Sequence, residues 1–283
     1  FETLLAHSLS SRGNAGKCLR LSRGFFVTLP GARGGNMPPW LSPLREQIQQ
    51  DPLYTWIIAS VAVFVTASWL GWLATRRQSH HPDGRLARWA RRGEVQGILW
   101  VVCFAYSLGI PYAALLLGLA SPRLLGLTEI NWVQSLGLGG ALAGIALAIL
   151  ILGWWGYRRE VPPPPDLLPW PLAILDVAAL QGHWALYRAG ATLWLNDAYG
   201  GVWAGLALVA LEAALVPFTW QALAAPDNAE KTLRPAAFAF SSTVLFYFTH
   251  NLWLCWAFHC IGEMALTRWI PSRAGIGREK PMP

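Results

Sequence analysis

Residues 242–269 read STVLFYFTHNLWLCWAFHCIGEMALTRW, an almost entirely apolar and aromatic stretch that still contains two histidines, two cysteines and a glutamate. The rest of the chain is similarly apolar, because 54% of its 283 residues are hydrophobic and only 13% are charged. Soluble globular domains carry roughly 25% charged residues. The composition therefore excludes an ordinary soluble domain and favours an integral membrane protein.

Apolar stretches of suitable length recur along the chain. A transmembrane helix needs about 20 residues at about 1.5 Å each. The first five stretches of about this length are residues 55–74, 96–120, 133–155, 167–190 and 199–223. The last block, residues 235–269, would measure about 50 Å as one helix and is too long for a single span. Three consecutive polar residues, Thr249, His250 and Asn251, favour a tight turn within it. The sequence thus predicts an all-α bundle of about seven transmembrane helices.

Positive charge predicts how these helices are oriented. Arginines gather in residues 76–92, in residues 158–159 and in residues 268–280, which lie on one side of a seven-span arrangement. Cytoplasmic loops retain Lys and Arg, so we expect these segments in the cytoplasm and the loop at Asp197 outside. The net charge of +7 is explained in this way without a nucleic-acid partner. The expected partner is the lipid bilayer, and the expected location is the plasma membrane of a bacterium.

A proline-rich segment divides the predicted membrane region. Residues 161–171 include four consecutive prolines at 162–165, which favour a stiff, extended linker. The linker separates an N-terminal three-helix membrane part, residues 37–160, from a C-terminal four-helix part, residues 172–270. The ionisable residues within the predicted spans all lie in the C-terminal part.

The two ends are interpreted apart from the bundle. Residues 1–36 are rich in Ser, Gly and Arg and precede Met37, which is a plausible start of the protein. We interpret them as a disordered leader or upstream read-through, and a transit peptide is the alternative. Residues 271–283 are predicted to form a basic cytoplasmic tail.

Ionisable residues inside a bilayer are costly, so each one within a predicted span is a candidate functional residue. Asp176 and His183 are seven residues apart and share a helix face, whereas Cys255, His259 and Glu263 share another at a spacing of four. Both histidines are predicted about 10–12 Å below the outer membrane edge, so they could meet at one depth. A simpler interpretation is that these residues only hydrogen-bond the helices together.

Metal binding is a further alternative for this group. Imidazole, thiolate and carboxylate are suitable ligand types, and they are supplied by His183, Cys255, His259 and Glu263. Their spacing matches no strong zinc signature, including His-Glu-x-x-His. No metal and no other cofactor is therefore predicted. The cysteines predict no disulfide framework, since Cys255 and Cys260 lie inside an apolar span.

The segment THNLWLCWAFHCIGE, residues 249–263, resembles the last motif of the CAAX protease and bacteriocin-processing (CPBP) intramembrane endopeptidases. In that family a Thr-x-Asn-Leu-Trp turn precedes a helix that carries a histidine and, four residues later, an asparagine or aspartate. His259 falls on the histidine, and Glu263 falls on the later position as a different residue type. The resemblance covers residues 169–269 and implies peptide hydrolysis within a polar cavity.

The two other motifs of that family are altered in this chain. The first, Glu-Glu-x-x-x-Arg, corresponds to HWALYR at residues 183–188, where Arg188 matches and His183 and Trp184 replace the glutamates. The middle motif, Phe-x-x-x-His, has PFTWQ at residues 217–221 as its nearest counterpart. The catalytic positions that the resemblance implies are His183, Arg188, His259 and Glu263.

The altered motifs leave three functional hypotheses. In the family a glutamate activates water, so its loss removes the expected general base, although the imidazole of His183 is a competent base near neutral pH. The chain is first interpreted as a catalytically inactive membrane scaffold or peptide-binding protein, whose partner is a membrane-embedded or prenylated peptide. The second hypothesis is an active intramembrane endopeptidase with altered residues. The third is a transporter that uses Asp176, Glu212 and the histidines as a proton relay.

Overall fold

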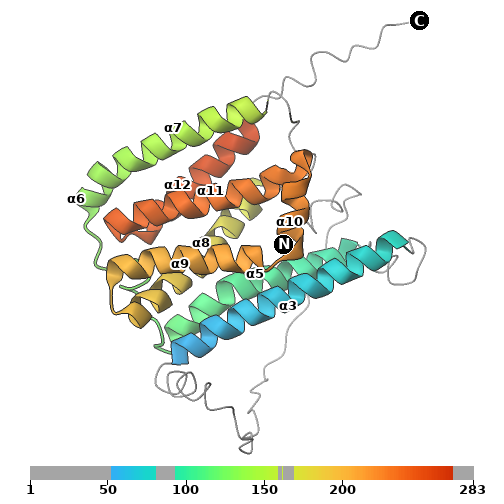
Figure 1. Cartoon of the computed structure of the whole chain (residues 1–283). Coiled ribbons are helices and arrows are strands. Elements are labelled where there is room, and N and C mark those ends of the chain that lie inside the picture. Colours follow the sequence, from blue (N-terminus) through green and yellow to red (C-terminus); the bar gives the residue numbers. More distant parts are fainter. Residues whose placement is uncertain (1–51, 81–92, 159–160, 162–168, 270–283) are drawn as a thin grey trace, which may run out of the picture.

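The fold is a bundle of helices, seen here in a computed structural model that describes residues 52–80, 93–158, 161 and 169–269 (Figure 1). Within these ranges no strand occurs, so the all-α prediction is confirmed. The predicted leader, the basic tail and residues 162–168 of the proline-rich linker lie outside the described residues.

The helices follow the apolar stretches of the sequence closely. In chain order they are α3 (Pro52–His80), α5 (Gly93–Leu116), α6 (Trp132–Gln134), the π-helical η2 (Ser135–Gly139), α7 (Gly140–Tyr157), α8 (Trp170–Leu195), α9 (Ala198–Ala214), α10 (Pro217–Ala224), α11 (Pro226–Thr249), α12 (Leu252–Met264) and the π-helical η3 (Ala265–Trp269). The α5 helix ends four residues earlier than predicted, since Gly118 turns the chain with a φ of +70°. Figure 1 places α3 and α7 at opposite edges of the bundle.

Helix α8 links the two hydrophobic cores of the bundle. Tyr187, on one side of α8, packs in a core with Leu53 and Ile57 of α3. Trp184, on another side, packs in a second core with Phe238 of α11 and with residues of α7 and α12. Helix α8, which belongs to the C-terminal four-helix part, therefore makes buried contacts with helices of the N-terminal three-helix part as well as with helices of its own part.

Two described helical segments are long and apolar enough to cross a membrane, Pro52–Arg76 and Trp132–Tyr157. A third is added if α9 and α10, which are bent by 78°, count as one broken span. The sequence predicted a single span there, but Pro217 begins α10 and cannot donate a backbone hydrogen bond to the preceding turn. The number of seven spans is not confirmed, although all the predicted stretches contain helices.

The turn predicted within residues 235–269 is confirmed. Helix α11 ends at Thr249, and His250 has a φ of +47°, in the left-handed region. The His250 amide still donates to the Phe246 carbonyl at 2.8 Å. Asn251 then begins the next helix, since its side chain accepts a hydrogen bond from the Leu254 amide at 3.1 Å. Two separate helices, α11 and α12, consequently flank this turn.

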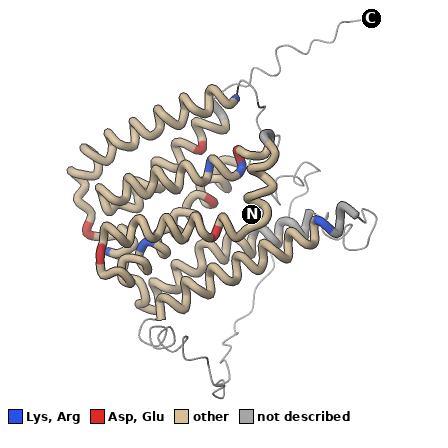
Figure 2. The backbone as a smooth tube through the Cα atoms, viewed as in Figure 1, with Lys and Arg blue, Asp and Glu red and all other residues tan. Residues whose placement is uncertain are grey.

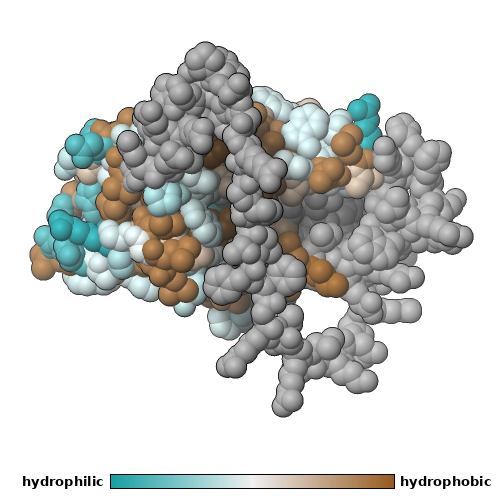
Figure 3. All heavy atoms as spheres, turned by 90° about the horizontal axis from the view of Figure 1, so that it is seen from below, coloured by the Kyte–Doolittle hydropathy of each residue, from teal (hydrophilic) through white to brown (hydrophobic). Residues whose placement is uncertain are grey.

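The outer surface of the bundle suits an apolar environment. Figure 2 shows that few charged residues interrupt the described helices, and Figure 3 shows broad hydrophobic areas on one face. Large apolar side chains such as Leu70, Leu116 and Ile149 are more than 60% exposed. Such side chains are stable against lipid, so the surface agrees with the membrane association that the helix lengths suggest.

Candidate functional site

Helix α8 carries the replaced motif into the interior of the bundle. It packs against α5, α9 and α12, and residues 183–191 of α8 are all buried. His183, Trp184 and Arg188 are exposed by 5, 6 and 2% respectively. Trp184 and Arg188 share one face of the helix and line the same crevice, whereas His183 points to another face and pairs with Glu212.

His183 forms a buried pair with Glu212 of α9. The His183 Nε2 atom lies 3.4 Å from Glu212 Oε2, and both side chains are at most 7% exposed. The imidazole also contacts the rings of Tyr106 and Tyr187, with centroid distances of 5.8 and 4.5 Å. The outer atoms of the pair, His183 Nδ1 and Glu212 Oε1, find no hydrogen-bond partner within the described part of the chain. An imidazole beside a carboxylate can hold and exchange a proton.

A small group of hydroxyls adjoins this pair. Ser60 of α3 has its Oγ 2.7 Å from the Tyr106 hydroxyl and 3.5 Å from the Tyr187 hydroxyl. Tyr106 comes from α5 and Tyr187 from α8, so the group joins three helices. Polar contacts of this kind hold transmembrane helices together, and they extend the polar region around His183 toward α3.

His259 of α12 has a separate set of partners. Its ring is stacked between Trp184 (centroids 5.6 Å, planes at 7°) and Phe238 (4.3 Å and 24°). The Gln181 side-chain amide lies 3.1 Å from His259 Nδ1 and also donates to Ser242 Oγ at 2.8 Å. The imidazole thus contacts two aromatic rings and a neutral side-chain amide at one nitrogen.

Glu263 belongs to a network of charges farther along α12. Arg234 Nη2 lies 3.2 Å from Glu263 Oε1, and Arg234 Nη1 lies 3.5 Å from Glu230 Oε1. Glu230 also accepts hydrogen bonds from Arg158 at 2.5 Å and from the Trp154 indole at 3.3 Å. The network ties α7, α11 and α12 together. Arg158, assigned from the sequence to a cytoplasmic loop, is only 1% exposed.

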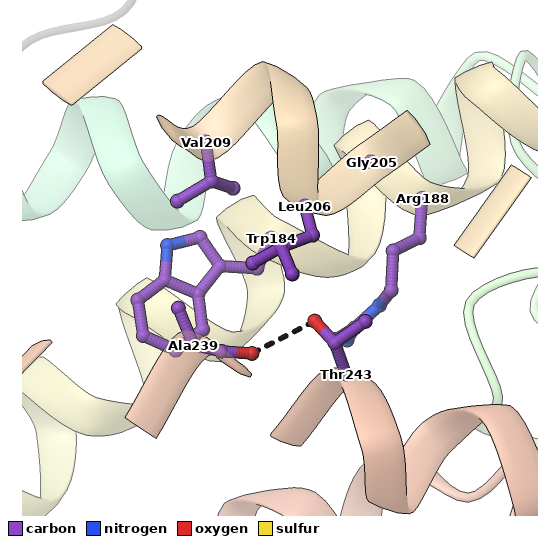
Figure 4. Close-up of a pocket in the computed structure, with 7 residues that line it drawn as sticks. All are labelled: Trp184, Arg188, Gly205, Leu206, Val209, Ala239 and Thr243. Atoms are coloured by element: carbon purple, nitrogen blue, oxygen red, sulfur yellow. Dashed lines mark hydrogen bonds between the residues drawn. The ribbon is translucent and has the colours of Figure 1, made fainter. Parts of the chain in front are cut away.

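Arg188 reaches a narrow crevice between α8, α9 and α11 (Figure 4). Its guanidinium carbon lies 4.4 Å from the centre of the Phe246 ring, and in the segments that the structure describes its Nε and Nη2 atoms have no hydrogen-bond partner. The crevice has no room for a water-sized sphere. The residues that line it are Trp184, Arg188, Gly205, Leu206, Val209, Ala239 and Thr243.

The structure does not gather the four candidate residues around one cavity. Of the four, only Arg188 lines the crevice; His183 pairs with Glu212, and Glu263 pairs with Arg234. The aromatic rings around His183 differ from those around His259. Helical spacing assigned each residue to a face, but it carried no information about the partner on the next helix.

The structure supports neither a metal site nor the assignment of residues 217–221 to the middle motif of the CPBP family. Throughout the described part of the chain, no three His, Cys, Asp or Glu side chains are grouped as a metal site would require. The nearest counterpart of the middle motif forms α10, and its Gln221 lines a separate cleft of about 450 Å³ with Trp72, Thr75 and Arg76 of α3.

Sequence reasoning missed several residues that shape the interior. Gln181 and Trp184 are three residues apart on α8 and both contact His259, so their spacing was an available signal. A second signal was Gly201-x-x-x-Gly205, a pattern of small residues that lets helices approach closely. A Cβ atom at Gly205 would lie 2.7 Å from Arg188 Cα. Close packing of α9 on α8 therefore depends on these glycines.

Comparison of the chain with protein-family models, with curated proteins and with solved structures gives no match in any of the three. The resemblance to the CPBP endopeptidases consequently rests on the residues themselves.

Proposed function

We propose that this chain is a multi-pass membrane protein with a CPBP-like C-terminal part that does not cleave peptides and acts as a scaffold or as a binding protein for membrane-embedded peptides. One observation carries the proposal. Trp184, which stands where the family has its second glutamate, is stacked on His259, the residue that matches the family histidine. An indole ring thus occupies the place where a carboxylate would help to activate water.

The surroundings of both histidines support this reading. A general base must lie within about 2.6–3.2 Å of the proton that it removes, or reach it through one water. The His259 ring stacks with Trp184 and with Phe238, and the neighbouring crevice has no room for a water-sized sphere. His183 is paired with Glu212 on a different face of α8. Neither imidazole is open to water, since His183 and His259 are 5 and 3% exposed.

The proposal includes the seven-span arrangement in a bacterial plasma membrane. Every predicted span contains a helix, two described segments are long and apolar enough to cross a membrane, with a third if α9 and α10 form one span, and α8 packs against several other helices. Intramembrane ionisable residues are expected to face the interior of a bundle, and His183, Arg188, Glu212 and His259 do so.

A cleavage assay on the purified protein tests the absence of peptidase activity. In liposomes, we expect no processing of prenylated or membrane-spanning peptides beyond that of a vector-only preparation. The double variant His183→Glu, Trp184→Glu should also be inactive, since the middle motif is not restored. Cleavage by the natural chain that disappears in His183→Ala or His259→Ala would refute the proposal. Retention of a labelled prenylated peptide by the natural chain, without cleavage, would support peptide binding directly.

A second candidate function is favoured by the His183–Glu212 pair. Its buried position, with 3.4 Å between His183 Nε2 and Glu212 Oε2, is what a proton-coupled transporter needs in its interior. The test is solute uptake into proteoliposomes with and without a pH gradient. Gradient-dependent uptake that is lost in Glu212→Gln, but kept in the exposed control Glu129→Gln, would establish this function over the first.

A further inference from the structure

Arg188 is a buried cation for which the described residues supply no counter-ion. It is 2% exposed, and two of its guanidinium nitrogens have no acceptor among the described residues. It forms no ion pair with any residue that the structure describes. The Phe246 ring attracts the cation at 4.4 Å but accepts no conventional hydrogen bond. Burial of an unpaired charge is strongly unfavourable, so the site is suited to a group that supplies negative charge.

The surrounding groups do not neutralise this charge. The buried glutamates that the structure describes, Glu212 and Glu230, are engaged with other residues at 3.4 and 2.5 Å. Cys255 faces Arg188 from α12, but its thiol donates to a backbone carbonyl at 3.4 Å and is neutral in that role. The crevice that Arg188 lines has no room for a water-sized sphere in this conformation.

The crevice lies where α9 and α11 pack against each other, and this line of contact between the two helices is called the seam. Figure 4 shows Arg188 extending toward Thr243, with side chains of α9 on one side of the crevice and those of α11 on the other. The seam is lined partly by small residues, including Gly205 and Ala239. Nearby on the outer surface, Trp203 of α9 and Phe240 of α11 are 42 and 54% exposed, and their ring centroids are 6.2 Å apart.

We propose that Arg188 binds the anionic head of an amphiphile, a carboxylate or a phosphate on an apolar chain, that enters between α9 and α11. The guanidinium fork matches either head group in a bidentate manner. Exposed aromatic rings beside the seam offer an apolar surface for the chain. Because the crevice is closed in this structure, entry requires outward movement of its lining side chains. The proposal does not depend on whether the protein cleaves peptides.

The experiment measures thermal unfolding of the full chain in a neutral detergent with defined probes. The probes are oleate and phosphatidate as anionic amphiphiles, oleyl alcohol and diacylglycerol as neutral counterparts, and acetate and inorganic phosphate as anions without a chain. We expect the amphiphilic anions alone to raise the melting temperature of the natural protein. Oleate and phosphatidate together distinguish a carboxylate head from a phosphate head.

Variants identify Arg188 as the binding residue. Arg188→Met should weaken binding of the anionic amphiphile by about tenfold or more and raise the melting temperature of the ligand-free protein, because the unpaired charge is gone. Arg188→Lys should retain part of the binding, since lysine keeps the positive charge but lacks the two parallel N–H donors of the guanidinium group. Arg123→Met removes a cation that is 75% exposed and paired with Glu129, so it should bind like the natural chain.

Several results would overturn the proposal. Equal effects of oleate and oleyl alcohol would show that charge is not recognised, and equal effects of phosphate and phosphatidate would show that the chain is not needed. An amphiphile effect that survives in Arg188→Met would place binding elsewhere. If ligand-free Arg188→Met melts at a lower temperature than the ligand-free natural chain, then the charge of Arg188 is already compensated by groups of the protein.

Discussion

His250 holds the turn between α11 and α12 in a conformation that is unfavourable for a side chain. Its φ of +47° lies in the left-handed region, where a Cβ atom costs about 1–2 kcal/mol and glycine is not penalised. The residue is exposed, and its ring contacts only the rings of Phe246 and Tyr199 among the described residues, with centroid distances of 5.5 and 6.1 Å.

His250→Gly should therefore stabilise the protein by about 1 kcal/mol. The measurement is thermal unfolding in detergent, followed by tryptophan fluorescence. The control is Ala207→Gly at an exposed position inside α9, where glycine should lower stability by about 1 kcal/mol. Loss of stability in both variants would show that the His250 side chain contributes more than its backbone conformation costs.

Arg158 and Glu230 form a buried ion pair at 2.5 Å, with side-chain exposures of 1 and 5%. Arg158→Met should destabilise the bundle by about 3 kcal/mol, because it leaves a buried carboxylate with a weaker set of partners. The double variant Arg158→Met, Glu230→Met should recover most of that loss. Chemical unfolding of both variants in mixed micelles measures the coupling. The exposed control Arg123→Met should change stability by less than about 1 kcal/mol.

At the scale of elements, α8 and α9 approach each other through glycine. A Cβ atom at Gly201 would lie 2.3 Å from Thr192 Cα, and one at Gly205 would lie 2.7 Å from Arg188 Cα. These contacts are with backbone atoms, so a side-chain rotation cannot relieve them.

Gly205→Ala should consequently cost about 2–3 kcal/mol through overpacking. The matched control is Gly144→Ala on α7, where an added Cβ would have no atom within 4 Å and should raise helix stability slightly. Thermal unfolding of both variants in one detergent gives the comparison. Equal stabilities would mean that α9 can move away from α8 without cost, and would weaken the case for a tightly packed α8–α9 pair.

At the scale of the whole molecule, the distribution of arginines predicts the orientation in the membrane. We expect a cysteine at position 85, in the arginine-rich segment after α3, to be protected from an impermeant thiol reagent in intact cells. A cysteine at position 195, beside Asp197, should react. Both would be introduced into a chain without its four natural cysteines, and lysed cells would serve as the positive control. Reaction of both positions from outside would exclude the seven-span arrangement.

The sequence alone determined the helices and the turn at His250. Apolar stretches of sufficient length predicted the helices that the structure contains, since a helix satisfies its own backbone hydrogen bonds from local residues. Three consecutive polar residues predicted the turn, and Asn251 caps the following helix as its residue type allows. The bend before Pro217 also has a local cause, the proline itself. It was not predicted from the sequence, because residues 199–223 form one continuous apolar stretch.

The tertiary structure alone decided which polar groups meet. His183 pairs with a residue 29 positions away and Arg158 with one 72 positions away, and the His259 partner Gln181 is 78 positions away. A helical period states which residues share a face, but the rotation and height of each helix depend on packing against its neighbours. That packing set Trp184 against His259 and left Arg188 beside a crevice, because residues so distant in sequence become neighbours only when the helices assemble.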